Sequence, residues 1–352
     1  MREIDMNDLN LLRKAIEDID SEIVRLMIKR NDTAEIIGKL KIDNNLELRN
    51  TDVEKKVIER YRELSEDSSL PADVSELVAR ALISASVDLQ YSLPRKNMKK
   101  NVTVVGGKGK MGQWIARYFE ARGSGVNIVD ISVGNINDAA DSDIVVISVP
   151  INSVGPVLKD VDRICKKDAL IFDISSVKTP FSALIKDMAE RRKVCSVHPM
   201  FGPSVRSVVS RRIIICDCGN REAVSEAAEI FSNEGMNIII TDIEKHDELM
   251  SYVLALAHAS NIVFFTALRS SGIPFDDLKN AASSTFDKVI ETCMPVSNEN
   301  ASLYHEIQRS NIDADDMWRV YEKAFAEVKE ASLSNDPKHF AELMELGKRY
   351  FE

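Results

Sequence analysis

The stretch "NVTVVGGKGKMGQWIARYFE", residues 101–120, joins a short apolar run to a helical pattern through a glycine-rich turn. Its glycines Gly107, Gly109 and Gly112 have the spacing GxGxxG, directly after the predicted strand and before the predicted helix. In that setting they provide a tight turn, a close approach of the backbone to a pyrophosphate, and close packing of helix on strand. The stretch therefore predicts a dinucleotide-binding unit.

The same loop offers further contacts to a dinucleotide. Lys110 and Met111 stand before its last glycine, at the expected N-terminus of the helix, where free amides and the helix dipole favour anions. The next predicted strand ends at Asp130, 18 residues after Gly112. A carboxylate there accepts a hydrogen bond from a ribose 2′-hydroxyl and repels a 2′-phosphate, so the sequence predicts NAD rather than NADP.

Outward from this loop the chain divides into three blocks. Residues 101–241 alternate short β-branched runs such as "DIVVISVP" and "ALIFDIS" with helical segments, which is typical of a parallel α/β sheet of Rossmann type. Residues 1–93 and 242–352 are predicted to be helical, and the polar stretch 94–100 is a predicted linker. We expect a multidomain protein, with an all-α domain, an α/β NAD-binding domain and an all-α C-terminal domain.

The first helix of the N-terminal block contains a cation where its apolar seam calls for an apolar residue. The seam from Leu9 to Leu26 continues onto Arg30, and a buried cation is costly unless it meets an anion. Lys41 follows three turns later on almost the same face, about 16 Å along the axis. Arg13 points well off that face.

Ser86 and Gln90 form a polar pair, four residues apart, on one face of the last helix of this block. With the cations of the first helix they predict a cationic pocket for a small dicarboxylate inside a helical bundle. The alternative is a set of salt bridges between helices, and periodicity alone does not choose between the two.

Composition limits the class of protein. The 352 residues are 44% hydrophobic and 29% charged, as in ordinary soluble proteins, and the net charge of −10 argues against nucleic-acid binding. We find no apolar run of about 18 residues and no signal-peptide core, so we expect no membrane span and a cytoplasmic location. The five scattered cysteines fit no disulfide or zinc spacing, and no metal site is expected.

Residues 9–91 resemble the all-helical class of chorismate mutase, a domain-swapped helical dimer. The resemblance is carried by "LLRKAIEDID", "LMIKR", "GKLK", "TDVE" and "SVDLQ". It implies the rearrangement of chorismate to prephenate by positioning and electrostatic stabilisation. It also implies roles for six residues. Arg13, which reaches into the partner's site, and Arg30 would bind carboxylates, and Lys41 and Gln90 would donate to the ether oxygen. Glu54 would hold the substrate hydroxyl, and Ser86 would contact the substrate.

Two positions depart from that family. Asn50 and Val53 stand where an aspartate and an arginine are usual, so the pocket lacks one cation. Arg49 is the neighbouring residue that could compensate. We expect a working but weakened mutase.

Residues 101–350 resemble prephenate dehydrogenase. After the glycine loop, the resemblance is carried by "DISSVK" (173–178), "HPMFGP" (198–203), "KHDELM" (245–250) and "LYHEI" (303–307). It implies that prephenate loses a hydride to NAD⁺, a hydroxyl proton, and its ring carboxylate as CO₂. A mutase followed by a dehydrogenase matches bifunctional enzymes of tyrosine synthesis, in which the product of one half is the substrate of the other.

His198 ends the predicted strand "VCSVHP" beside a proline-rich turn, at the sheet edge where the cofactor crevice is expected. A neutral histidine is a suitable acceptor for the hydroxyl proton, and the resemblance gives His198 that catalytic role. By the same resemblance Ser176 hydrogen-bonds near the hydroxyl, Lys178 lies nearby as a substrate contact, and His258 contacts the substrate.

Lys288, in "SSTFDKVIE", takes the position of the family arginine that holds the ring carboxylate. A lysine supplies charge without the planar two-pronged geometry of a guanidinium, and Arg269 is the nearest arginine that could substitute. His246 precedes His258 by twelve residues, so on a straight helix it faces elsewhere, and we expect it to help start its helix.

The sequence therefore predicts a bifunctional enzyme that acts on chorismate and prephenate with NAD, as a homodimer through its helical domains. The long helix after residue 242 is apolar nearly all round, which favours burial against a second subunit. The alternative is an arogenate dehydrogenase whose N-terminal helical block only dimerises or regulates.

Overall fold

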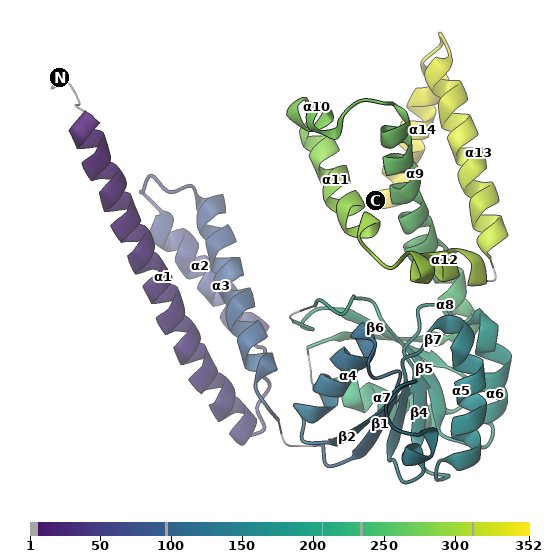
Figure 1. The fold of residues 1–352 in the computed structure, drawn as a ribbon. Coiled ribbons are helices and arrows are strands. Elements are labelled where there is room, and N and C mark those ends of the chain that lie inside the picture. The colour runs from purple at the N-terminus through teal and green to yellow at the C-terminus, as the bar shows by residue number, and fades with distance from the viewer. Residues whose placement is uncertain (1–5, 96–97, 206, 233–234, 312) are drawn as a thin grey trace.

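The computed structural model describes residues 6–95, 98–205, 207–232, 235–311 and 313–352, and it has a helical N-terminal part, a central α/β part and a helical C-terminal part (Figure 1). The N-terminal part consists of α1 (Met6–Asp43), α2 (Thr51–Ser65) and α3 (Ala72–Ser92). The side chain of Asn50 caps α2 by accepting from the backbone N–H groups of Asp52 and Val53. That cap explains why a short polar residue stands at position 50.

The N-terminal end of α1 extends beyond the turn that joins α2 and α3 (Figure 1). Large apolar side chains along it stay exposed, among them Leu12 at 58% and Ile19 at 58%. Such a stripe on a long helix is typical of a surface that packs against another, because burying it would add hydrophobic stabilisation.

The central part is a seven-stranded sheet in the order β2-β1-β3-β4-β5-β6-β7. The strands are β1 (Asn101–Val105), β2 (Gly125–Val129), β3 (Ile144–Ile147), β4 (Leu170–Asp173), β5 (Val194–Pro199), β6 (Arg212–Asp217) and β7 (Asn237–Asp242). The neighbours from β2 to β5 are parallel, as predicted, but β5 and β6 are antiparallel. The described residues between β5 and β6 contain no crossover helix, and the chain returns beside β5 in the opposite direction.

Helices cover both faces of this sheet. Helices α4 (Lys110–Glu120) and α7 (Arg221–Ser232) bury their apolar faces in one core with the sheet. On the other face α5 (Ile151–Ile164) and α6 (Ser182–Ala189) form a second core, into which α8 also packs. The short 3₁₀ helices Ile136–Ala139 and Thr179–Phe181 complete the connections.

The C-terminal part begins with a continuous helical stretch: α8 (Ile243–Met250), a π-helix (Ser251–Leu256) and α9 (Ala257–Ser270). It continues as α10 (Phe275–Asn280), α11 (Ser284–Ser297), α12 (Ala301–Ser310), α13 (Ala314–Leu333) and α14 (Lys338–Phe351). By length and composition the stretch Ile243–Ser270 could cross a membrane, which the sequence prediction had not anticipated, and 22% of its most apolar window is buried within the protomer.

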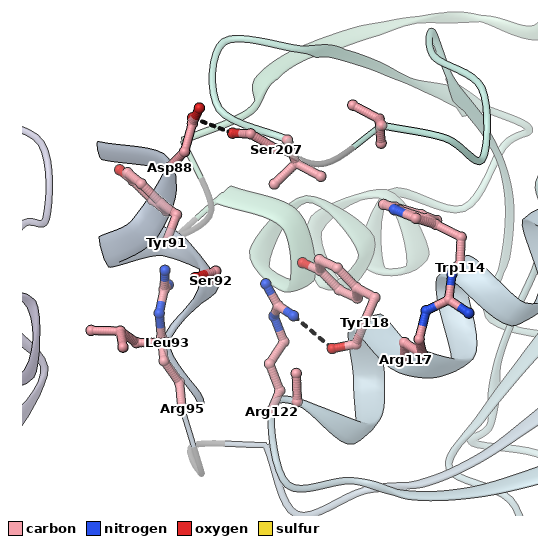
Figure 2. A pocket seen from close by; sticks show the side chains of 13 residues that line it. Asp88, Tyr91, Ser92, Leu93, Arg95, Trp114, Arg117, Tyr118, Arg122 and Ser207 are labelled. Carbon is pink, nitrogen blue, oxygen red and sulfur yellow. Dashed lines mark hydrogen bonds between the residues drawn. The ribbon is translucent and has the colours of Figure 1, made fainter. Parts of the chain in front are cut away.

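The N-terminal helices contact the α/β part at the end of α3. Asp88 of α3 accepts a hydrogen bond from Ser207, which lies in the loop between β5 and β6 (Figure 2). A cavity of about 310 Å³ opens at this junction, between the end of α3 and α4.

Candidate active sites

The glycine loop between β1 and α4 is closely fitted to its surroundings. A Cβ on Gly112 would lie 2.2 Å from the carbonyl oxygen of Gly106, and one on Gly107 would lie 2.6 Å from Ile128. Gly109 is the N-cap of α4, and the nearest atom to its added Cβ is 3.3 Å away. Two of the glycines are thus required by packing, whereas Gly109 leaves its side of the loop open for a ligand.

The sheet topology places this loop at a crevice. Strand β1 lies between β2 and β3, and the order reverses direction there, which is where open α/β sheets bind their ligands. Asp130 follows β2, and its carboxylate accepts from the backbone N–H of Lys108, in the glycine loop, at 2.9 Å. Lys110 and Met111 form the first turn of α4. These residues fit a dinucleotide whose pyrophosphate rests on the amides of α4.

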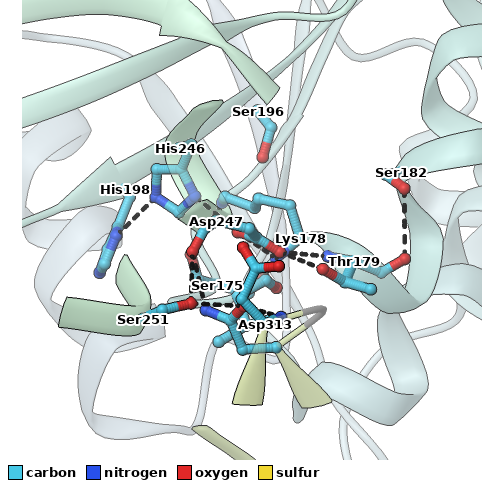
Figure 3. A network of polar contacts seen from close by, with 12 residues as sticks. Ser175, Lys178, Thr179, Ser182, Ser196, His198, His246, Asp247, Ser251 and Asp313 are labelled. Atoms are coloured by element: carbon cyan, nitrogen blue, oxygen red, sulfur yellow. Dashed lines mark hydrogen bonds and ion pairs between the residues drawn. The ribbon is translucent and has the colours of Figure 1, made fainter. Parts of the chain in front are cut away.

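A chain of hydrogen bonds leads from His198 into the protein (Figure 3). His198, at the end of β5, is 4% exposed, and its Nδ1 lies 2.9 Å from Nε2 of His246. Nδ1 of His246 lies 2.7 Å from Oδ1 of Asp247. The prediction that His246 only starts its helix is therefore wrong, because its side chain is fully buried against His198.

The hydrogen bonds from His198 through His246 to Asp247 fix which nitrogen of each histidine carries a proton. The Asp247 carboxylate can only accept, so Nδ1 of His246 donates to it and Nε2 of His246 is left as an acceptor. His198 then donates from Nδ1, and no donor among the described residues occupies the lone pair on its Nε2. The arrangement prepares His198 to take a proton at Nε2.

Asp247 is itself firmly held. It accepts from the backbone N–H of Lys178 at 2.9 Å, from the backbone N–H of Thr179 at 2.6 Å and from the Thr179 hydroxyl at 2.5 Å. Burial alone would raise the pKa of Asp247, but the hydrogen bonds from His246 and Thr179 outweigh it and lower that pKa. Asp247 is therefore a carboxylate at neutral pH.

Both histidines are neutral at neutral pH. Burial lowers the pKa of His198, and the nearby His246 and Lys178 lower it further. Burial also lowers the pKa of His246, although its hydrogen bond to Asp247 acts in the opposite direction. A neutral His198 is the form that can accept a proton.

Lys178 does not face a substrate site. Its side chain is 0% exposed, and Nζ donates to Asp173 Oδ1 at 2.8 Å, to the Ser175 carbonyl at 2.7 Å and to the Val197 carbonyl at 2.9 Å. All three N–H bonds are used, so none remains for a substrate. This geometry contradicts the predicted substrate contact, and instead Lys178 joins the ends of β4 and β5 beside His198.

The remaining predicted dehydrogenase residues are less tightly connected. Ser176 is half-buried at the end of β4. His258 stacks on Tyr304, with ring centroids 4.2 Å apart; burial lowers its pKa, and its buried Nδ1 has no partner within the described residues. Lys288 is exposed on α11, and no contact found in the described part of the chain joins it to the His198 chain.

The N-terminal helices enclose a cavity of about 520 Å³, with mostly apolar walls and polar groups from all three helices. Arg30 donates to the Leu82 carbonyl at 2.6 Å and to the Ser86 hydroxyl. Lys41 donates to the Leu48 carbonyl at 2.6 Å. The polar lining residues are Arg30, Thr33, Lys41, Asn50, Glu54, Ser86 and Gln90. Five of the six residues predicted for the mutase site thus line one cavity.

The sixth, Arg13, does not line it. Arg13 precedes Arg30 by 17 residues on the same helix, which corresponds to about 25 Å. It is not among the residues that line the cavity, and this distance along the helix keeps it from the cavity of its own protomer.

Family models match nearly the whole chain. Residues 12–91 match chorismate mutase type II, residues 112–248 the nucleotide-binding domain of prephenate dehydrogenase, and residues 242–346 the dimerisation domain of prephenate dehydrogenase. The glycine loop and the sheet order define a nucleotide-binding fold, and the matches over residues 112–346 assign it to a dehydrogenase class.

Similar proteins agree with these matches. A probable arogenate/prephenate dehydrogenase of Methanocaldococcus jannaschii is 27% identical over 73% of this chain and 62% of its own length. A T-protein of Haemophilus influenzae is 26% identical over 86% of this chain and 81% of its own. A crystal structure of prephenate dehydrogenase from A. aeolicus, solved with hydroxyphenyl propionate and NAD⁺, covers 73% of this chain and 99% of that one, with 17% identity and a TM-score of 0.57. The chain belongs to the prephenate dehydrogenase family and carries a type II chorismate mutase domain at its N-terminal end.

Proposed function

We propose that the protein is a bifunctional enzyme that rearranges chorismate to prephenate and then oxidatively decarboxylates prephenate to 4-hydroxyphenylpyruvate. The observation that carries the proposal is a neutral His198 with its Nε2 free, at the carboxyl end of β5 and held by His246 and Asp247, in the same chain as a cationic helical cavity. The chain spans 62% of the M. jannaschii relative, so the activity of the whole protein is inferred and not taken from that relative.

In the dehydrogenase reaction His198 accepts the hydroxyl proton of prephenate at Nε2. The glycine loop and Asp130 would hold NAD⁺, which when bound would supply the acceptor for the hydride of the ring carbinol carbon. As the C–H bond gives up its electron pair, the bond between ring and carboxylate breaks, CO₂ leaves, and the ring becomes aromatic. Ser176 lies in the loop that follows β4, and we assign its hydroxyl to orient the substrate hydroxyl.

Protonated His198 is stabilised without a large movement. When Nε2 takes the proton, the positive charge lies at the end of a chain that finishes on the Asp247 carboxylate. Buried, pre-oriented dipoles of this kind stabilise a developing charge better than water does. Lys178 supports this arrangement by fixing the ends of β4 and β5, with its backbone N–H on Asp247.

The mutase reaction needs no proton transfer. We assign Arg30, which donates to Ser86, to bind a carboxylate, and Lys41 and Gln90 to donate to the ether oxygen as its bond breaks, because all three line the same cavity. Arg13 would come from a second subunit, because it cannot reach the cavity of its own protomer. The exposed apolar stripe on α1 and the match to a dimerisation domain favour a homodimer, and we place the enzyme in the cytoplasm.

Initial rates with purified protein test the proposal. With NAD⁺, prephenate should be oxidised faster than arogenate, and faster than with NADP⁺. His198→Asn should lower the turnover of prephenate by roughly 10²- to 10⁴-fold and leave chorismate consumption unchanged, and Lys41→Ala should do the converse. Faster oxidation of arogenate would overturn the substrate assignment, and an equal loss of both activities in either variant would overturn the assignment of two separate sites.

A further inference from the structure

Glu54, in the wall of the N-terminal cavity, is held from behind by an arginine. Arg49 donates from Nε to Glu54 Oε1 at 2.9 Å and from Nη2 to Glu54 Oε2 at 3.1 Å. This paired geometry fixes the plane of the carboxylate as well as its position. The Glu54 side chain is 18% exposed, and its hydrogen bond raises the pKa of Arg49.

Arg49 does not enter the cavity that Glu54 lines. It lines a neighbouring cavity, of about 610 Å³, on the side that faces the α/β part. Arg49 therefore does not replace the cation that is missing at Val53, since it reaches a substrate only through Glu54.

The remaining arm of Arg49 reaches the other domain. Nη1 donates to the hydroxyl of Ser210 at 3.0 Å. Ser210 is fixed in the α/β part, because its N–H donates to the Gly235 carbonyl at 2.7 Å and its own carbonyl accepts from Asn237 at 3.3 Å. It also has a positive φ of 59°, a conformation that a non-glycine residue holds only when its surroundings impose it.

A second contact comes from the same segment. Ser207 donates to Asp88, which stands on α3 between the cavity residues Ser86 and Gln90 (Figure 2). Residues 207–210 therefore touch two walls of the cavity from outside. The same segment leads into β6, which pairs with the strand that carries His198.

We propose that Arg49 is a positioning residue for Glu54, and that Ser210 of the dehydrogenase domain completes this clamp, so that the mutase site is built partly by the other domain. The inference rests on the proposed function, because Glu54 acts on the hydroxyl of chorismate. Its consequence is that a substitution in the dehydrogenase domain changes mutase kinetics and leaves dehydrogenase kinetics alone.

Three variants of the full-length protein test this: Arg49→Met, Ser210→Ala and the double variant. Arg49→Met should lower the mutase kcat/KM about tenfold, mostly through KM, because Glu54 would still be present but poorly held. Ser210→Ala should lower it about threefold. The double variant should be no worse than Arg49→Met alone, because Ser210 acts only through Arg49. Arg49→Lys, which keeps the charge without the paired geometry, should restore part of the loss.

Two matched controls separate positioning from a general loss of structure. Arg62→Met removes an arginine paired with Glu76 away from the cavity, and Ser232→Ala removes an exposed hydroxyl beside Arg49's cavity that donates to the Glu229 carbonyl. Both should keep wild-type mutase kinetics. Oxidation of prephenate, measured on each preparation, should be unchanged in all variants.

Unchanged mutase kinetics in Ser210→Ala, or losses that multiply in the double variant, would overturn the inference. Failure of the proposed function has a different signature, since the wild type itself would then not consume chorismate. In that case chorismate affinity, measured by calorimetry on the same variants, decides the inference: weaker binding in Ser210→Ala supports the clamp, and unchanged binding contradicts it.

Discussion

Removing the imidazole of His246 is expected to slow the dehydrogenase without displacing His198. In His246→Ala, Nδ1–H of His198 loses its acceptor, 2.9 Å away, inside the protein. A buried donor left without a partner costs about 1–3 kcal/mol, and His198 can escape that cost by shifting its proton to Nε2. With its proton on Nε2, His198 cannot accept the proton of the substrate. The reactive tautomer, with the proton on Nδ1, is therefore disfavoured by the same free energy of about 1–3 kcal/mol. At about 1.36 kcal/mol for each tenfold change, kcat should fall roughly 5- to 150-fold.

Steady-state oxidation of prephenate at saturating NAD⁺ measures this effect. The KM for prephenate should change less than about threefold, because His246 lies behind His198 and does not face the substrate. His246→Gln, whose amide oxygen can accept from His198, should recover part of the lost turnover. Chorismate consumption by the same preparation is the internal control for folding. A kcat within twofold of wild type in His246→Ala would refute the reasoning.

Three further predictions concern the loop, the pH dependence and the dimer. Gly112→Ala should lose NAD⁺ binding or fold poorly, because its Cβ would lie 2.2 Å from a backbone oxygen. Gly109→Ala should keep the wild-type Tm and only weaken NAD⁺ binding, measured by titration. Burial lowers the pKa of His198 in the folded protein below its usual 6.5, so the unfolded chain binds more protons at acid pH. The stabilising contribution of His198 should therefore be complete above about pH 6.5 and should be lost as the pH falls below that value. His198→Asn should flatten the dependence of Tm on pH. If Arg13 acts in the partner's site, a dimer of one Arg13→Ala subunit and one Lys41→Ala subunit has one intact mutase site. Mixing the two inactive proteins and letting their subunits exchange should therefore restore about a quarter of wild-type mutase activity. No recovery despite exchange would contradict a shared site.

The fold class could be predicted because its signals are local. The glycine spacing after a β-branched run, and the change from period-two to helical patterns, depend on neighbouring residues alone. The antiparallel pairing of β6 was not predicted, because the connection after β5 has no periodicity that indicates its direction.

The site was harder to predict, because its contacts are between segments distant in sequence. Comparing His246 only with His258, twelve residues further on, misses its partner, which is His198 at the end of β5, 48 positions away in the sequence. Lys178 was taken for a substrate contact because its motif matched. Its burial depends on the carbonyl of Val197 in the next strand, which no sequence pattern reveals.

The most direct test of the bifunctional assignment is an assay in which chorismate and NAD⁺ are the only small-molecule reactants. We expect NADH and 4-hydroxyphenylpyruvate to form in equal amounts after a short lag. We expect Lys41→Ala to abolish this signal and still to oxidise added prephenate. NADH formation from prephenate but not from chorismate, by the wild-type protein, would contradict the claim that both sites are catalytic.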